Sequence, residues 1–218
     1  MKKAAYWLIL FVSILWVLHT ISKNFIVDPQ FNRFLSMKQN ELFNKSLWFM
    51  MIRVHIVLAV IALITGPIAL SKKIRVKSLF MHRWMGRIYV GSIVLNYIPG
   101  FYVSFYATGG ILSTIGFIVL NTLWLFSTLK GLWLGKAKKM VLHSRWMIRS
   151  YALSLANMTI YILVTIFNKV LDLEYEVSYM LAVWLCSILN LTLAEFTIRF
   201  FSSFNKRYSE TKITRVVR

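Results

Sequence analysis

Six long apolar stretches constrain this sequence more than any other feature, because each is close to the length at which a helix crosses a membrane. Such a crossing takes about 20 residues for a hydrocarbon core about 30 Å thick. The stretches are continuous rather than alternating, which favours helices over the strands of a membrane barrel. The sequence therefore predicts an all-α polytopic membrane protein, a bundle of about six transmembrane helices. The expected spans are Ala4–Ser22, Trp48–Leu70, Trp84–Ala107, Ile111–Leu134, Trp146–Phe167 and Tyr179–Phe201.

The charge balance points to a bilayer rather than to nucleic acid. Of the 218 residues, 58% are hydrophobic, and 26 Lys and Arg face 7 Asp and Glu, which gives a net charge of +19. A nucleic-acid-binding surface would set its cations among polar neighbours on a soluble face. Here the cations gather between the apolar stretches. The expected partner is therefore the lipid bilayer, and no nucleic acid is expected.

The positions of the cations also predict the orientation in a cell membrane, because cytoplasmic loops carry the excess of Lys and Arg. The first three residues, the loops 71–78 and 135–145 and the tail 206–218 are basic, whereas the third loop is uncharged and the fifth is net acidic. Both termini are therefore expected in the cytoplasm, which an even number of spans allows. The first stretch is too long for a secretory signal and lacks a cleavage site, so it is expected to remain as a helix.

One basic, aromatic phrase occurs twice. HRWMGRIY begins at His82 and HSRWMIRSY at His143, each at the start of an expected span, and five of seven positions agree when the Arg-Trp-Met segments are aligned. We therefore expect two parallel helix-hairpin repeats, related by an axis along the membrane normal. The expected organisation is one membrane domain, 1–218, with the first two spans and their outer loop in 1–70, repeats in 71–134 and 135–205, and a basic cytoplasmic tail in 206–218.

Each phrase contains two arginines four residues apart, which therefore share a helix face. One interpretation is that they are the positive-inside signal, with Trp84 and Trp146 as interfacial anchors. In the other, four guanidiniums converge on an anion at the cytoplasmic face, such as a lipid phosphate, a carboxylate or the propionates of a cofactor. Arginine's planar fork suits such oxyanions better than lysine does. These arginines are Arg83, Arg87, Arg145 and Arg149.

The histidines allow a haem hypothesis. His82 and His143 lie at the cytoplasmic boundary, and His19 and His55 lie in the outer part of the first two spans. Two histidines on each side would suit a b-type cytochrome, with His55, His82 and His143 as ligands of haem iron. However, His82 precedes its Arg-Trp-Met by one residue and His143 by two, a rotation of roughly 100° on a helix. The alternative is that the histidines bond to backbone and lipid headgroups.

An asparagine stands near the middle of each of the last four spans, and these side chains are expected to face one another. They would act as polar contacts between helices, averaging about 0.6 kcal/mol each, or would line a small polar cavity. They are Asn96, Asn121, Asn157 and Asn190. Glu195 lies at membrane depth and needs a partner. Arg199 is favoured at the i,i+4 spacing, and Arg149 is the interhelical alternative.

Several chemistries are not expected. There is no Gly-rich phosphate loop, no Ser/His/Asp signature and no H-E-x-x-H helix. The single cysteine, Cys186, excludes disulfides, redox pairs and iron–sulfur clusters within one chain. A hydrolytic or transferase enzyme is therefore not expected, whereas a redox role stays open.

The two phrases resemble the motifs of an uncharacterised bacterial family of predicted multi-pass membrane proteins, a domain of unknown function. Its members carry His-Arg-x-x-Gly-Arg-x-Tyr, here beginning at His82, and His-Arg-x-Trp-Met-x-Arg-Ser-Tyr-Ala-Leu, here beginning at His143. Ser144 stands where the family pattern often has Arg. His55 with Gly66-Pro67 is also similar to the family's pattern. The resemblance covers roughly residues 48–165, and it implies a helical membrane protein without supplying a reaction.

The leading hypothesis is a membrane module that binds an anionic cofactor or lipid at its cytoplasmic face, with haem b as one such cofactor. It would serve the respiratory chain in electron transfer or assembly. The anion ligands would be the four arginines, and His55, His82 and His143 would be polar or axial ligands. The alternatives are a small-solute transporter that uses the repeat interface and the asparagine layer, and a structural partner of another membrane complex.

Overall fold

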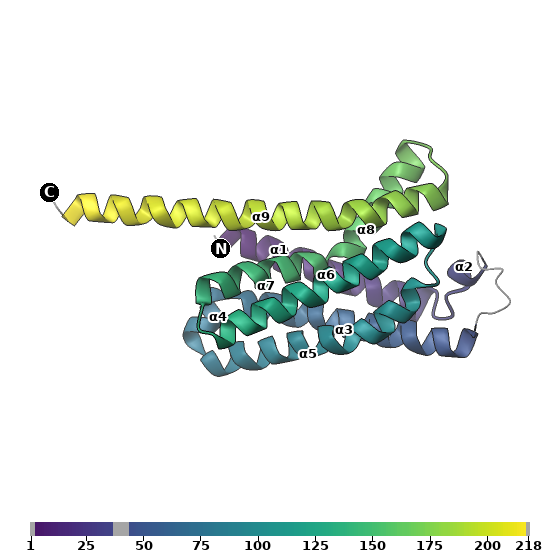
Figure 1. Cartoon of the computed structure of the whole chain (residues 1–218), viewed down its shortest axis with the longest axis horizontal. Coiled ribbons are helices and arrows are strands. Elements are labelled where there is room, and N and C mark those ends of the chain that lie inside the picture. Colours follow the sequence, from purple (N-terminus) through teal and green to yellow (C-terminus); the bar gives the residue numbers. More distant parts are fainter. Residues whose placement is uncertain (1–2, 37–43, 217–218) are drawn as a thin grey trace.

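The computed structural model describes residues 3–36 and 44–216, and the regular secondary structure within these residues is helical, without strands. The predicted all-α class is therefore confirmed, and Figure 1 shows the long helices lying side by side. The helices are α1 (Lys3–Ile21), α2 (Asn32–Leu35), α3 (Lys45–Leu70), α4 (Lys72–Lys77), α5 (Leu79–Ser104), α6 (Gly110–Lys136), α7 (Met140–Ser154), α8 (Ala156–Thr165) and α9 (Tyr175–Val216), with π-helical segments η1 (Ser22–Val27) and η2 (Ile166–Val170).

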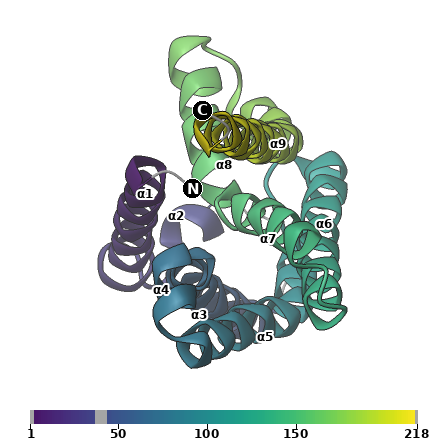
Figure 2. The same cartoon turned by 90° about the vertical axis from the view of Figure 1, so that its left-hand side faces the viewer.

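α7 is the helix that holds the bundle together. It packs against α3, α6 and α9, while α5 packs against α3 and α6, and α1 packs against α3. The end-on view shows α7 between α6, α9 and α3 (Figure 2). The main cluster of buried apolar side chains joins these helices through Ile93 on α5, Met147 on α7 and Val183 on α9. The second copy of the repeated phrase therefore lies in the middle of the fold.

The outer surface of the bundle is apolar, as a bilayer requires. Side chains such as Leu95, Ile111 and Phe196 are more than half exposed. Water would disfavour this surface, whereas lipid tails are equally apolar. Among the described residues, four helices are long and apolar enough to cross a membrane, and α7 with α8 forms a bent fifth candidate. The four are Tyr6–Val27, Lys45–Leu70, Gly110–Lys136 and Tyr175–Phe200.

α5 is as long as α3 but less hydrophobic, and it is not among these four candidates. The reason lies on its buried side, where most side chains are small or polar. They follow helical spacing: Tyr89, Ser92, Ile93, Asn96, Pro99, Gly100 and Ser104. α5 still lies along α3 (Figure 1). The expected count of six spans, with α5 as the third, stays a prediction.

The expected span Trp146–Phe167 is broken at Leu155, which corrects the prediction of one continuous helix. α7 and α8 meet at a bend of 44°. Neither Gly nor Pro stands at this break. Instead, the Ser154 hydroxyl donates back to the Ser150 carbonyl oxygen over 3.3 Å, a local bond of the kind that bends helices. Beyond the bend, α8 packs against α9.

The basic segment 71–78 forms a short helix, α4, rather than a simple loop. The Ser71 hydroxyl accepts from the Ile74 amide over 3.3 Å, and the Ser78 hydroxyl accepts from the Met81 amide over 3.2 Å, so serines cap both α4 and α5. The cations of α4 are exposed: Lys72, Lys73, Arg75 and Lys77. The capped turn therefore presents four positive charges to one end of the bundle.

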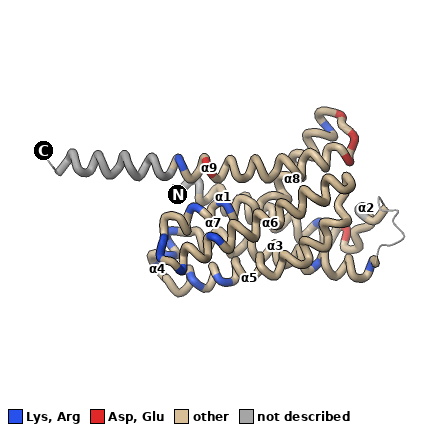
Figure 3. Tube along the Cα trace, viewed as in Figure 1, with Lys and Arg blue, Asp and Glu red and all other residues tan. Residues whose placement is uncertain are grey.

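Most of the described acids lie at one end of the bundle, whereas Lys and Arg occur at both ends and are most concentrated at the other (Figure 3). Lys and Arg gather where α4, the starts of α5 and α7 and the end of α6 meet, and we call this the basic end. Asp28 and the acids of 172–176 follow η1 and η2 at the opposite end, which we call the acidic end. Glu195 is the only other acid among the described side chains. α1 begins near the basic end, and α9 runs past it (Figure 1).

Candidate functional site

The tyrosines that end the two phrases are buried cross-links between helices. Tyr89 is 1% exposed, and its hydroxyl is 2.7 Å from the Ser150 hydroxyl, which is 2.7 Å from the Thr128 hydroxyl. These bonds join α5, α7 and α6. The Tyr151 hydroxyl is 2.5 Å from the Ser13 hydroxyl and donates to the Leu63 carbonyl oxygen over 3.2 Å, which joins α7 to α1 and α3. The shared tyrosine therefore fixes the fold around α7.

Sequence reasoning assigned no role to these tyrosines. Near a membrane boundary an aromatic residue is usually read as an interfacial anchor. The available signal was that Tyr89 and Tyr151 are identities of the two phrases and follow their Trp by five residues. That spacing turns a helix by roughly 140° and sends Tyr and Trp to different sides.

The histidines of the phrases make equivalent contacts. His82 Nδ1 lies 2.9 Å from the Ala69 carbonyl oxygen at the end of α3, and His143 Nδ1 lies 2.7 Å from the Gly131 carbonyl oxygen near the end of α6. A carbonyl oxygen only accepts, so Nδ1 carries the proton in both rings. Each histidine therefore ties the start of its helix to the end of the preceding long helix, α3 for His82 and α6 for His143. The two histidines therefore make the same kind of contact, although their positions in the two phrases differ by one residue.

The environment of His82 favours the neutral form of its imidazole. Burial lowers the pKa of His82 from its usual 6.5, although the bond to Ala69 acts in the opposite sense, and the charges of Arg75, His143 and Arg83 lower the pKa further. His143 is therefore close enough to His82 for the two rings to interact electrostatically. His19 has other surroundings: it is exposed and stacks on Trp16, with ring centroids 4.9 Å apart.

The arginines of the two phrases share one contact and differ in another. The Arg87 guanidinium lies 5.3 Å from the centre of the Trp84 ring, and the Arg149 guanidinium lies 4.7 Å from the centre of the Trp146 ring. Arg149 also donates from Nε to Glu195 over 2.5 Å, the one ion pair found among the described side chains. The preferred local partner of Glu195 was therefore wrong, because α7 brings Arg149 directly to the face of α9 that carries the acid.

The two arginine pairs have different surroundings. Arg83 and Arg87 are exposed, whereas Arg145 and Arg149 are partly buried and share the field of Glu195. The first arginine pair is thus accessible to an external ligand, whereas the second pair is partly covered by the protein. Within the described chain, no group of three or more His, Cys, Asp or Glu is placed to hold a metal ion. The haem hypothesis with His55, His82 and His143 stays a prediction.

The asparagines do not form one layer. Asn96 and Asn121 are buried on α5 and α6, and Asn190 accepts from the Thr159 hydroxyl over 2.9 Å between α9 and α8. Asn157 is exposed, which corrects its placement in the core. Asn96 follows its phrase tyrosine by seven residues, two full turns, whereas Asn157 follows by six and stands beyond the break at Leu155.

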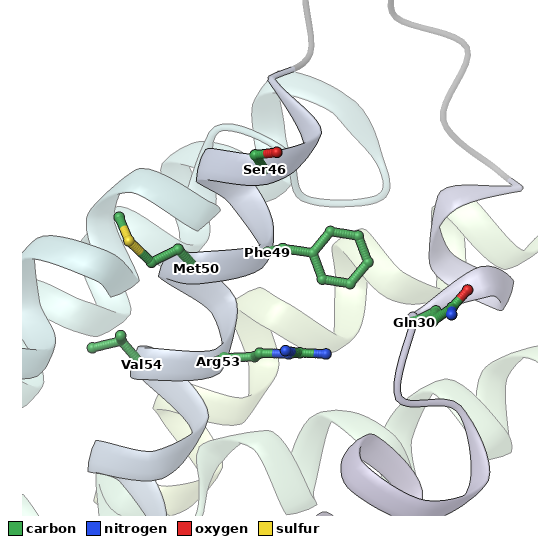
Figure 4. A pocket seen from close by; sticks show the side chains of 6 residues that line it. All are labelled: Gln30, Ser46, Phe49, Met50, Arg53 and Val54. Carbon is green, nitrogen blue, oxygen red and sulfur yellow. The ribbon is translucent and has the colours of Figure 1, made fainter.

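A shallow open groove of about 620 Å³ lies at the acidic end (Figure 4). The Arg53 side chain lies in it beside the Phe49 ring, whose centre is 5.6 Å from the guanidinium, and donates to the Pro29 carbonyl oxygen over 3.1 Å. The residues that line the groove are Gln30, Ser46, Phe49, Met50, Arg53 and Val54. Arg53 thus connects the start of α3 to the segment that precedes α2.

An all-helical bundle with an apolar outer surface, and with charges concentrated at its two ends, defines an integral membrane protein of the polytopic helical class. The chain belongs to the family described as "Predicted membrane protein (DUF2306)", whose model matches residues 52–198. The expected membership of an uncharacterised family of multi-pass membrane proteins is thereby confirmed, and the match extends into α9. Comparison with curated proteins and with solved structures found no match.

Proposed function

We propose that this membrane protein binds the headgroup of an anionic lipid at its basic end, with Arg83 and Arg87 as the anion ligands and Trp84 as the interfacial platform. The basic end would face the cytoplasm, as the distribution of cations suggests. The two arginines are exposed and lie four residues apart on one helix face. Arg87 stacks on Trp84, which leaves the edge of the guanidinium, with its N–H groups, for an oxyanion.

One observation carries the proposal: the two copies of the phrase differ in their supply of acid. Arg149 receives the Glu195 carboxylate, whereas Arg87 has no ion pair among the described residues. The sequence contains no Asp or Glu between Glu41 and Asp172, so none of α3, α5, α6 and α7 contains an acid for the first arginine pair. Glu195 is thus the anionic partner of Arg149, and an external anion would be the equivalent partner of Arg87.

The surroundings of the first pair favour a lipid over a soluble anion. α4 directly precedes α5 and presents four exposed cations beside it. Apolar side chains next to the arginines are also exposed, including Phe80 at 73% and Leu79 at 57%. Basic groups at a cytoplasmic surface attract anionic lipids by about 1 kcal/mol each. An apolar rim would in addition hold acyl chains, which inorganic phosphate lacks.

The test compares lipid retained by purified protein. Protein reconstituted with phosphatidylglycerol and phosphatidylcholine is washed in detergent at about 1 M salt, where the Debye length of about 3 Å removes diffuse attraction. Retained lipid is then identified by mass spectrometry. Wild type is expected to keep phosphatidylglycerol selectively, and Arg83→Gln/Arg87→Gln to lose it. Lys136→Gln/Lys139→Gln, which removes the same charge nearby, is the control and should keep it. Equal retention by both double variants would contradict the site.

A further inference from the structure

A second polar cluster lies inside the bundle, nearer the acidic end than the arginines. α3 contributes His55, α5 contributes Asn96 and Gly100, and α6 contributes Asn121. Asn96 and Gly100 are one helical turn apart and are both buried on the inner side of α5. Three helices thus bring hydrogen-bonding groups to one internal position.

Several polar atoms of this cluster lack a hydrogen bond of normal geometry among the described residues. Asn96 is 1% exposed, and neither its side-chain oxygen nor its nitrogen has a hydrogen-bond partner among the described residues. The Nδ1 atom of His55 is also buried and lacks a hydrogen bond of normal geometry in that part of the chain, although the Asn96 side chain is close enough to interact with the imidazole as a hydrogen-bonding group. Buried polar groups in proteins almost always bond to protein or to ordered water, and lipid offers no donor or acceptor in its place.

Gly100 brings the histidine and the second asparagine close to the α5 backbone. A Cβ atom at Gly100 would stand 3.1 Å from His55 Nδ1 and 3.2 Å from the side-chain oxygen of Asn121. The Asn121 side-chain nitrogen donates to the Ser104 hydroxyl over 3.2 Å, and that hydroxyl donates to the Gly100 carbonyl oxygen over 2.7 Å. These bonds hold Asn121 with its oxygen facing Gly100. Gly100 therefore allows both polar atoms to approach the α5 backbone more closely than a larger residue would permit.

We propose that His55, Asn96 and Asn121 bind an internal water molecule at Gly100, as a buried site for a small neutral hydrogen-bonding ligand. A buried water typically makes about three hydrogen bonds. The amide of Asn96 supplies a donor and an acceptor, Asn121 supplies an acceptor, and the imidazole of His55 supplies either. The sequence of α3, α5 and α6 contains no acid, so these helices offer no counter-ion that would favour a cation there. The site does not depend on the lipid proposal.

The water would continue a polar path along the inner side of α5. Tyr89, Ser92 and Asn96 are buried on that side, and Tyr89 reaches Ser150 and Thr128. A water at Asn96 would thus lengthen this row of buried hydrogen-bonding groups toward the acidic end.

The test is solid-state NMR on labelled protein in lipid bilayers. Magnetisation transfer from water is expected to reach the Asn96 side-chain amide and the His55 ring. Gly100→Ala places a methyl group 3.1 Å from His55 Nδ1 and should abolish both transfers. Gly91→Ala, on the same helix with nothing within 4 Å, is the control and should preserve them. A wild-type protein without water transfer at these groups, or a Gly100→Ala variant that keeps it, would overturn the proposal.

A second measurement does not require Gly100→Ala to fold. If water satisfies Asn96, then Asn96→Leu breaks those bonds and lowers the thermal midpoint of unfolding. If the amide is instead dry and unpaired, leucine removes an unfavourable burial and the midpoint rises. A higher midpoint for Asn96→Leu than for wild type therefore counts against the bound water.

Discussion

The two copies of the repeated phrase, at the starts of α5 and α7, make the same packing contacts with neighbouring helices. They differ in whether an acidic side chain lies beside their arginines. In each, a histidine bonds a carbonyl of the preceding long helix, an arginine stacks on tryptophan, and a tyrosine enters the core. Among the described side chains, only the second arginine pair meets an acid, Glu195. The shared residues therefore build the fold, and the unshared charge indicates where an external ligand would bind.

The first way to break this comparison is to disturb the part that both copies share. A Cβ atom at Gly66 would stand 2.4 Å from the Tyr151 ring and 3.1 Å from the Tyr89 ring, so Gly66→Ala must move at least one tyrosine. Overpacking of this kind costs about 1–3 kcal/mol, and lost tyrosine bonds would place this variant at the upper end. Thermal unfolding in detergent measures the loss. Gly86→Ala, where nothing lies within 4 Å, should not destabilise.

The second prediction concerns the acid that only one copy has. Glu195→Gln leaves Arg149 partly buried without its carboxylate. The side chains are 21% and 40% exposed, so solvent reduces the loss well below that of a fully buried pair, to about 1–2 kcal/mol. The midpoint of unfolding should fall accordingly. Glu176→Gln, an exposed acid at the other end, should leave it unchanged, and an equal effect of both variants would argue that the Arg149 pair is not special.

Much of the fold follows from the sequence, because apolar length alone determines where a membrane helix can lie. The expected spans Trp48–Leu70 and Ile111–Leu134 match α3, Lys45–Leu70, and α6, Gly110–Lys136, within a few residues. The break at Leu155 could not be predicted in this way. It lies beside a serine hydroxyl that bonds back to its own helix, in a stretch that contains neither Gly nor Pro.

The site was predicted less well, because its contacts join helices that are distant in the sequence. Glu195 was assigned to Arg199 by local spacing, yet the packing of α7 on α9 gives it to Arg149. The exposure of Asn157 could have been predicted. Asn157 follows Tyr151 by six residues, and two helical turns take about seven, so the two side chains do not share a helix face. The contact of His55 with the backbone at Gly100 depends on α3 and α5 lying together, which no pattern within either helix reveals.

The third prediction, with the smallest expected effect, concerns how the stability of the protein depends on pH through the histidine of the first phrase. His82 precedes the apolar part of α5, and burial lowers the pKa of its imidazole below 6.5, with Arg75, Arg83 and His143 adding to the shift. Between the folded and the unfolded pKa the unfolded chain binds more protons, so stability is complete above about pH 6.5 and decreases as the pH falls. Unfolding midpoints measured from pH 7.5 to 5 should show this decline in wild type and a shallower one in His82→Gln. Lys77→Gln, which removes a nearby exposed charge without removing the buried ring, serves as the control. If the decline persists undiminished in His82→Gln, then the neutral, hydrogen-bonded form of this ring is not what stabilises the contact between α3 and α5.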